Sequence, residues 1–304
     1  MRILKRIGRY FELLASRSKQ FFILRYIYYR CGGRDVIKLY NSYEKENTPL
    51  LSASPIWTCW WQGEDNMPAV VKICYESMKR CAGTHPVILI TKDNYSKYLD
   101  IPSFILEKKQ QGIIDLTHFS DIIRMLLLKQ QGGIWMDSTL LIPSGQIDDI
   151  IKPGMDFWTC RHVTPYLNVA RGGWVSFFVA AGKGHLIPSI IADLHIAYWK
   201  KCDKLVDYLL LDYAFAVATK WCSAAKDIIA KLPITEMGPL GKRLNAPWTA
   251  ENWNEACHRY HFHKITYKIP LETHTASGKL TNYGFLINSF LNDCLFESHI
   301  ASDK

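Results

Sequence analysis

Two short segments of this 304-residue chain carry side chains that could bind a phosphorylated or sugar ligand. Asp121 and Arg124 stand three residues apart in an apolar helical pattern, so both project from one face of the helix. Asp137 follows the short apolar run 134–136. A guanidinium suits a phosphate, whereas carboxylates suit sugar hydroxyls or a divalent metal. The spacing therefore predicts a ligand site at one edge of an α/β sheet, where such folds bind their ligands.

The elements that would position these side chains alternate between strands and helices. Gly132 would end the helix of Asp121 and Arg124, and the strand tipped by Asp137 would follow directly. This strand–helix–strand spacing predicts an α/β fold with parallel pairing and right-handed crossovers. Strands are expected at 56–61, 87–91, 134–137 (extended by 139–142), 157–160 and 174–180, and helices at 68–81, 117–131, 188–200 and 204–220.

Two motifs in this region resemble a known family of sugar transferases. Ser-Asp-x-x-Arg at 120–124 and Gly-Gly-Ile-Trp-Met-Asp-x-Thr at 132–139 are similar to the signature of glycosyltransferase family 32, in particular of the capsular polysaccharide synthesis proteins. The resemblance extends back to the segment 56–63 and covers residues 50–270. It implies a glycosyltransferase-A-like fold, which is a Rossmann-like nucleotide-diphospho-sugar transferase domain with a mixed central sheet.

The resemblance also implies a reaction and a set of site residues. The expected activity is that of a retaining glycosyltransferase, which moves a hexose from a nucleotide-diphosphate sugar, most simply a UDP-sugar, to a lipid-linked oligosaccharide acceptor in capsule or O-antigen synthesis. The expected catalytic residues are Asp137 and Arg124 of the motifs, together with Asp212, which is singled out as an acid inside an apolar helical run and could face the acceptor or the anomeric carbon. Donor contacts are expected from Trp57, Trp61, Gln62, Asn94, Ser120, Asp121, Arg124, Asp137, His263 and Lys264.

One position departs from the family pattern and bears on the cofactor. In the wider group the strand ends Asp-x-Asp, and the second Asp helps to hold Mn²⁺ or Mg²⁺ beneath the donor diphosphate. Here Thr139 stands at that position and offers a neutral ligand. The expected ligands of the divalent cation are therefore Asp137, Thr139 and His274. A histidine of the tail, His263 or His274, or else Lys264, could compensate by neutralising the leaving group.

Each of these residues also has a purely structural explanation. Asp121 and Arg124 could form an ordinary ion pair on a wet helix face, which contributes a few tenths of a kcal/mol. Asp137 could cap the turn after its strand, and Asp212 could be a paired or exposed helix charge. The aromatic residues, Trp57 included, could simply be core. Two rival functions stay open: a transferase of GDP-mannose, and a catalytically inactive sugar-binding or scaffolding relative.

The amino terminus carries most of the positive charge. The net charge is +9, and residues 1–30 contain eight Lys and Arg against Glu12 alone. Apolar and basic residues fall on opposite sides of a helical wheel, which fits a helix lying on an anionic membrane surface. Together with this charge, the family resemblance implies a peripheral location on the cytoplasmic face of the cell membrane. The alternative is a helix that packs on the catalytic domain. The expected domains are a membrane-apposed helical segment and linker, 1–50, and a catalytic domain with a carboxyl-terminal tail, 51–304.

The amino-acid composition argues against several other classes of protein. A hydrophobic content of 48% and a charged content of 21% are those of an ordinary globular protein. Nine cysteines at irregular spacing, without a C-x-x-C pair, argue against a disulfide scaffold or a zinc site and for a reducing compartment. No nucleic-acid-binding motif or second basic stripe is present, so no nucleic-acid partner is expected.

Overall fold

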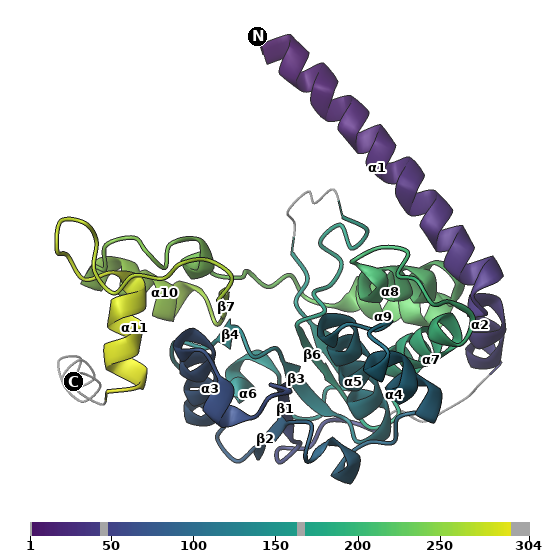
Figure 1. The fold of residues 1–304 in the computed structure, drawn as a ribbon, viewed down its shortest axis with the longest axis horizontal. Helices are drawn as coiled ribbons and strands as arrows, with labels where there is room; N and C mark the ends of the chain where they lie inside the picture. Colours follow the sequence, from purple (N-terminus) through teal and green to yellow (C-terminus); the bar gives the residue numbers. More distant parts are fainter. Residues whose placement is uncertain (1, 43–47, 163–167, 293–304) are drawn as a thin grey trace. The chain divides into compact units, whose positions relative to one another are not determined.

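The computed structural model describes residues 2–42, 48–162 and 168–292, with side chains from Glu12 onward (Figure 1). The chain forms two compact units, and each is assembled from three separate stretches of sequence. Unit 1 contains Met1–Leu50, Ser96–Gly133 and Met155–Ile234. Unit 2 contains Leu51–Tyr95, Ile134–Gly154 and Thr235–Lys304.

Unit 2 is built on a parallel three-stranded arrangement in the order β2-β1-β3. The strands are β1 (Ile56–Cys59), β2 (Val87–Ile90) and β3 (Gly133–Met136). Ile56 pairs with Val87 on one side and with Ile134 on the other, so the three strands run in one direction. Their carboxyl ends consequently lie at one edge, and the loops that follow each strand meet there. Between β1 and β2 runs α3 (Ala69–Cys81), with Pro68 at its N-cap.

The rest of unit 2 comes mainly from the carboxyl-terminal third of the chain. The short strands β4 (Leu140–Leu141) and β7 (His263–Lys264) pair antiparallel. The helix α11 (Asn282–Phe290) packs on α3, where Arg80 donates a hydrogen bond of 3.0 Å to the Ser289 carbonyl. The remaining helices of this unit are η1 (Glu64–Asn66), α6 (Ile147–Ile150), η3 (Leu240–Lys242) and α10 (Ala250–Arg259).

Unit 1 is mostly helical. Its helices include α4 (Ser103–Gln110), α5 (Leu116–Gln130), α7 (Leu186–Lys201), α8 (Leu210–Trp221) and α9 (Ser223–Lys231), beside the antiparallel strands β5 (Phe157–Thr159) and β6 (Phe178–Ala181). Asp115 caps α5 by accepting a hydrogen bond from the His118 amide. The expected inward residues Ile122, Ile123, Leu126 and Leu127 are all buried against neighbouring elements such as α7. With parallel and antiparallel strands both present, the expected mixed α/β class is confirmed.

The turn-forming and polar residues of 31–54 predict a linker, and this prediction is wrong for Gly33–Asn41, which forms a helix, α2. The turn formers Gly32 and Gly33 make a tight corner between α1 (Arg2–Arg30) and α2. A Cβ at Gly33 would lie 2.8 Å from the Ile27 carbonyl oxygen, so only glycine fits this close approach. Beyond the corner, the Tyr40 hydroxyl donates a hydrogen bond of 2.6 Å to Asp193 on α7.

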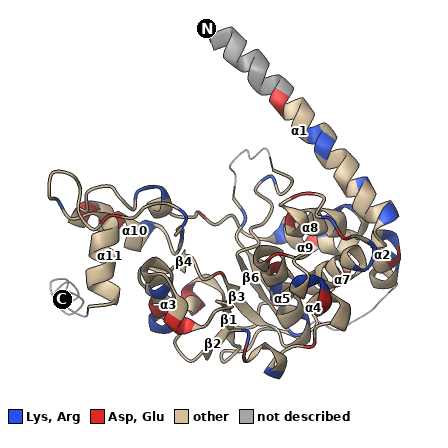
Figure 2. Ribbon diagram, in the orientation of Figure 1, with Lys and Arg blue, Asp and Glu red and all other residues tan. Residues whose placement is uncertain are grey.

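The described side chains of α1 divide into a packed face and an exposed aromatic face. Ile23 and Ile27 are buried, and Tyr28 stacks on Trp221 of α8 with ring centroids 4.1 Å apart. In Figure 1 the end of α1 lies beside α2, and its beginning extends away from α7, α8 and α9. Figure 2 shows basic residues spread along the described part of this helix. Within the described residues, no helix combines the length and the apolar character needed to span a bilayer.

Candidate functional site

The central feature of unit 2 is a cluster of Asp137, Thr139 and Lys264. Asp137 comes directly after β3, and Lys264 lies on β7 with its backbone paired opposite Leu140. The Lys264 ammonium donates hydrogen bonds to Asp137 Oδ2 at 2.7 Å and to Thr139 Oγ1 at 2.6 Å. Trp135 Nε1 donates to the other carboxylate oxygen of Asp137 at 2.8 Å. The sequence predicted all three members of the cluster, although they are up to 127 positions apart.

This cluster is held in place yet reachable from solvent. The Asp137 and Lys264 side chains are 22% and 28% exposed. Ile265 donates a backbone hydrogen bond of 3.0 Å to the Thr139 carbonyl, so the two segments stay joined next to the charged groups. A carboxylate, a hydroxyl and an ammonium are thus available at the carboxyl edge of the parallel strands, the usual ligand-binding edge of an α/β sheet.

An aromatic loop follows β1 at the same edge. Trp61 lies against Tyr95, with ring centroids 5.3 Å apart at an angle of 38°. Trp60 meets Tyr267 edge-on at 5.6 Å, so the segment after Lys264 reaches this loop. Backbone hydrogen bonds from Trp60 to Ile90 and from Lys92 to Trp61 tie the loop to the end of β2. Tyr95 was not expected at this edge from the sequence, although Tyr95 follows the neighbouring strand β2 in the same way that Trp61 follows β1.

Gln62 and Gly63 form the turn of this loop. Gln62 is exposed, and its carbonyl accepts a hydrogen bond of 2.9 Å from Asn66. Gly63 has a φ of 90° and no atom within 4 Å of the position that a Cβ would occupy. The backbone here is therefore left uncovered by neighbouring side chains of the protein.

Three expected donor residues have structural roles in the protein. Trp57 is a buried core residue of β1. The Asn94 amide accepts from the Thr91 amide and donates to the Leu89 carbonyl, both at 2.8 Å, so it closes the loop after β2. His263 is completely buried, because neighbouring residues of a strand point to opposite faces and Lys264 takes the accessible one.

His263 instead anchors β7. Its Nε2 donates to the Ala256 carbonyl at 3.1 Å, its Nδ1 accepts from the Leu240 amide, and burial lowers its pKa. Gly238 packs directly on the imidazole ring. The other expected histidine, His274, is exposed in the 273–281 turn and contacts the Thr273 hydroxyl.

The oxygen atoms of the Asp137 and Thr139 side chains do not suit a divalent cation. Asp137 Oδ1 and Oδ2 accept from Trp135 and Lys264, and Thr139 Oγ1 accepts from the same ammonium. Among the side chains in 12–42, 48–162 and 168–292, no group of three or more His, Cys, Asp and Glu is arranged to hold a metal. A cation placed between residues 137 and 139 would have to displace Lys264.

Unit 1 contains the second group of expected residues, which is centred on Arg124. Its guanidinium lies 3.3 Å from Asp121 one helical turn away, and their side chains are 5% and 11% exposed. This pair is therefore buried, whereas the structural alternative predicted a solvent-exposed ion pair on the helix surface. Ser120 lies in the second turn of α5, and its hydroxyl donates to the Thr117 carbonyl at 2.7 Å.

Asp212, in the first turn of α8, belongs to the same unit. Trp174 Nε1 donates a hydrogen bond of 2.9 Å to Asp212 Oδ1, and the indole stacks on Phe215. Burial raises the pKa of Asp212 to about 6, against the opposing effects of the Trp174 hydrogen bond and the positive charge of Arg124. The alternative of an exposed charge is thus wrong, since the carboxyl is buried with a hydrogen-bond donor.

His195 on α7 was missed by the sequence analysis. It is buried, and neither ring nitrogen has a hydrogen-bond partner among the described residues. Burial lowers its pKa to about 3, with further contributions from His118 and Arg124. His195 is therefore a neutral ring at physiological pH. A single histidine in an apolar helix carries no sequence signal that would distinguish it.

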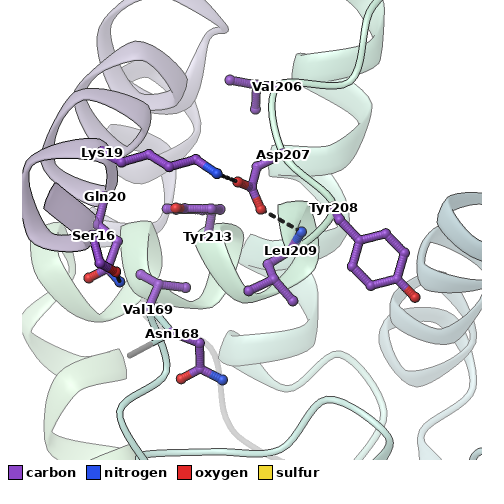
Figure 3. A pocket seen from close by; sticks show the side chains of 10 residues that line it. All are labelled: Ser16, Lys19, Gln20, Asn168, Val169, Val206, Asp207, Tyr208, Leu209 and Tyr213. Carbon is purple, nitrogen blue, oxygen red and sulfur yellow. Dashed lines mark hydrogen bonds and ion pairs between the residues drawn. The ribbon is translucent and has the colours of Figure 1, made fainter. Parts of the chain in front are cut away.

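A cavity of about 570 Å³, lined by both apolar and polar side chains, lies beside α1 in unit 1 (Figure 3). Lys19 forms an ion pair of 2.6 Å with Asp207, which also accepts a hydrogen bond from the Leu209 amide. His118 Nε2 contacts the Tyr208 carbonyl at 3.2 Å, so the cavity wall is held by α5. The lining consists of Ser16, Lys19, Gln20, Asn168, Val169, Val206, Asp207, Tyr208, Leu209 and Tyr213.

Comparisons with known proteins agree with the resemblance seen in the sequence motifs. "O-glycosyltransferase PaGT" of Phomopsis amygdali is 21% identical over 196 residues, covering 60% of this chain and 48% of its own. The chain thus spans about half the length of this curated relative. The solved structure "PaToxG Glycosyltransferase" matches 84% of this chain and 96% of its own, at 16% identity and a TM-score of 0.39. The model of the "Capsular polysaccharide synthesis protein" family matches residues 16–283, and the chain belongs to this family.

Proposed function

We propose that this protein is a glycosyltransferase that uses a nucleotide-diphosphate sugar, with a UDP-hexose as the donor, in capsular polysaccharide or O-antigen synthesis. The observation that carries the proposal is the cluster of Asp137, Thr139 and Lys264 at the carboxyl edge of the parallel strands. Membership in the capsular polysaccharide synthesis family supports the same conclusion.

The chemistry of unit 2 suits each part of such a donor. The ring pair of Trp61 and Tyr95 offers a flat apolar surface for the base. The Asp137 carboxylate suits ribose or sugar hydroxyls, and the Lys264 ammonium suits the diphosphate. The uncovered backbone at Gly63 allows a ligand to come close. These features lie on consecutive loops of one edge, as a donor that spans base, ribose and diphosphate requires.

We propose a retaining reaction. The bond between the anomeric carbon and the diphosphate breaks, the new bond to the acceptor oxygen forms on the same face, and the leaving phosphate takes the acceptor proton. This chemistry depends on stabilising the departing negative charge more than on a strong base. Asp121 and Arg124 remain predicted donor contacts on the basis of the family motif. Asp212 remains a predicted catalytic residue because it is an acid within an apolar helix.

A lipid-linked oligosaccharide is the proposed acceptor. The cavity beside α1 has a volume typical of small-molecule sites, and hydroxyl, amide and charged groups line it, as a saccharide needs. The exposed rings of Phe21, Phe22 and Tyr29 on α1, together with Arg25 stacked on Phe21, suit the interface of an anionic membrane. We therefore propose that the protein lies peripherally on the cytoplasmic face of the cell membrane.

The first experiment is a thermal-shift screen with UDP, GDP and CMP, each with and without Mn²⁺. A ligand that binds only the native state raises the free energy of unfolding by about 2.7 kcal/mol at a hundredfold excess over its Kd. A shift with UDP alone is expected, whereas a shift with GDP alone would select the GDP-mannose alternative. No shift with any nucleotide would reject the donor site.

A second assay separates an enzyme from an inactive relative. The hydrolysis of the bound nucleotide sugar is measured without an acceptor, with Asp137→Asn as the control. Slow hydrolysis that depends on Asp137 is expected of a transferase. Nucleotide binding without any hydrolysis would favour the scaffolding alternative.

A further inference from the structure

Lys264 places a positive charge where the family pattern implies a divalent metal ion. Its ammonium bridges Asp137 Oδ2 at 2.7 Å and Thr139 Oγ1 at 2.6 Å, the two residues of the Asp-x-Thr motif. We propose that Lys264 is a built-in substitute for the metal, so that the donor diphosphate binds without a divalent cation. This inference rests on the proposed donor site and names the group that neutralises its diphosphate.

The first argument is the coordination chemistry of the motif. Mg²⁺ requires near-octahedral oxygen ligation, and carboxylates are its usual protein ligands. Thr139 supplies only a neutral hydroxyl, and that hydroxyl already accepts a hydrogen bond from Lys264. Both oxygens of Asp137 are bonded as well, one to Trp135 and one to Lys264. A divalent cation at this point would also be repelled by the ammonium beside it.

The second argument is that the backbone fixes the position of Lys264. The pairing of Leu140 with Lys264 and of Leu141 with His263 sets the register of β4 and β7. The Ile265 amide bonds to the Thr139 carbonyl on the adjoining residue. The buried His263 ring, packed against Gly238, holds β7 from its opposite face. A cation fixed in this way needs no rearrangement when charge develops on a ligand, which is the condition for effective electrostatic stabilisation.

The third argument is the accessibility of the charge. The Lys264 side chain is 28% exposed, so an anion can approach it from solvent. When the bond from the anomeric carbon to the diphosphate breaks, the electron pair leaves with the diphosphate oxygen. The ammonium stabilises that oxygen by charge and hydrogen bonding. Lys264 is accordingly a catalytic residue of the proposed reaction.

The first test uses the metal alone. Mn²⁺ is titrated into the wild-type protein, Thr139→Asp, and the double variant Thr139→Asp/Lys264→Gln, and bound Mn²⁺ is followed by electron paramagnetic resonance. Saturable binding is expected only in the double variant, which restores Asp-x-Asp and removes the ammonium. In Thr139→Asp the new carboxylate pairs with Lys264. Saturable Mn²⁺ binding by the wild type that disappears in Asp137→Asn would overturn the proposal.

The second test measures the Kd of UDP by calorimetry in EDTA and in Mn²⁺. Equal affinities are expected for the wild type. Lys264→Gln should weaken binding by about tenfold or more, since a charge-assisted hydrogen bond is lost, while Lys264→Arg should keep most of the affinity. A requirement for Mn²⁺ in the wild type, or an unchanged Kd in Lys264→Gln, would contradict the proposal. Absence of UDP and GDP binding under both conditions would reject the donor site, and the Mn²⁺ titration would still decide whether Lys264 excludes the metal.

Discussion

Trp174 and Asp212 form a partly buried hydrogen bond of 2.9 Å between an indole N–H and a carboxylate oxygen. The contact joins the loop before β6 to the first turn of α8. Because the indole can donate but not accept, it stabilises the charged form of the acid. Burial acts in the opposite direction and dominates, which leaves the pKa of Asp212 at about 6.

Asp212→Asn should change how stability depends on pH. The folded-state pKa of about 6 lies above the ordinary value of 3.8, so between these two values the native state binds more protons than the unfolded state. The free energy of unfolding of the wild type should therefore fall as pH rises from 4 to 7, by about 2–3 kcal/mol relative to Asp212→Asn. Urea unfolding of both proteins at several pH values measures this difference. If the two proteins gave parallel pH profiles, burial would not raise the pKa of the Asp212 carboxyl.

Trp174→Phe is the matched variant for the same carboxyl. It keeps the ring that stacks on Phe215 but removes the N–H donor. The pKa of Asp212 should rise further, and the fall in stability should move to higher pH. A shift to lower pH would mean that the indole does not stabilise the carboxylate.

Arg124→Met should destabilise the protein strongly. Removing one member of a buried ion pair leaves an uncompensated charge, with a typical cost of about 3–5 kcal/mol. The pair of Asp121 and Arg124 is buried at a separation of 3.3 Å, so the cost should fall in this range. Denaturant unfolding of the single variants and of Asp121→Asn/Arg124→Met gives their coupling energy. A strictly additive double variant would show that the two residues do not depend on each other.

Phe21→Ser/Phe22→Ser should weaken binding to anionic vesicles. Phe22 is 69% exposed, and both rings lie on the outer face of α1. Co-sedimentation with phosphatidylglycerol vesicles should fall several-fold while the melting temperature stays nearly constant, since exposed residues contribute little to stability. Ile234→Ser, an exposed apolar residue outside α1, is the control. Equal sedimentation of the two variants would argue against α1 as the membrane contact.

Gly238→Ala should disturb the donor site from a distance. An added Cβ would lie 1.9 Å from the His263 ring, so β7 must move and carry Lys264 with it. Weaker nucleotide binding and a loss of about 1–3 kcal/mol in stability are expected from such overpacking. The double variant Gly238→Ala/His263→Ala removes the clash and should recover part of the nucleotide affinity. No recovery would mean that the ring does not transmit the effect.

The sequence predicted those features that depend on local periodicity. The apolar pattern of α5 placed Asp121 and Arg124 on one face, and the apolar run of β3 ended at Asp137. Whether the pair of Asp121 and Arg124 is exposed to solvent or buried depends on what packs against α5. The local sequence pattern does not contain this information. For the same reason, Trp57 and Trp61 look alike in sequence, although one is core and the other lies at the sheet edge.

Local sequence patterns could not predict the contacts that form between segments far apart in the chain. β4 and β7 have two residues each, too few for a recognisable alternation, yet their pairing brings Lys264 to Asp137. The resemblance supplied Lys264 only as one of several cations of the tail. The choice between Lys264 and His263 follows from which face of β7 is buried. At the corner between α1 and α2, Gly32 and Gly33 suggested a linker. Glycine is used both in flexible segments and where two helices pack closely, so its presence alone does not distinguish the two.

The interleaved composition of the two units has a consequence for synthesis on the ribosome. Unit 1 draws on Met1–Leu50 but also on residues up to Ile234, so α2 emerges long before the α7 surface on which it packs. Unit 2 cannot be completed until the β7 segment has been translated. The nascent chain must therefore carry unpaired apolar surface until the last segment of each unit has been translated. A chain truncated before β7 would leave the apolar surface of unit 2 exposed and would be prone to aggregate.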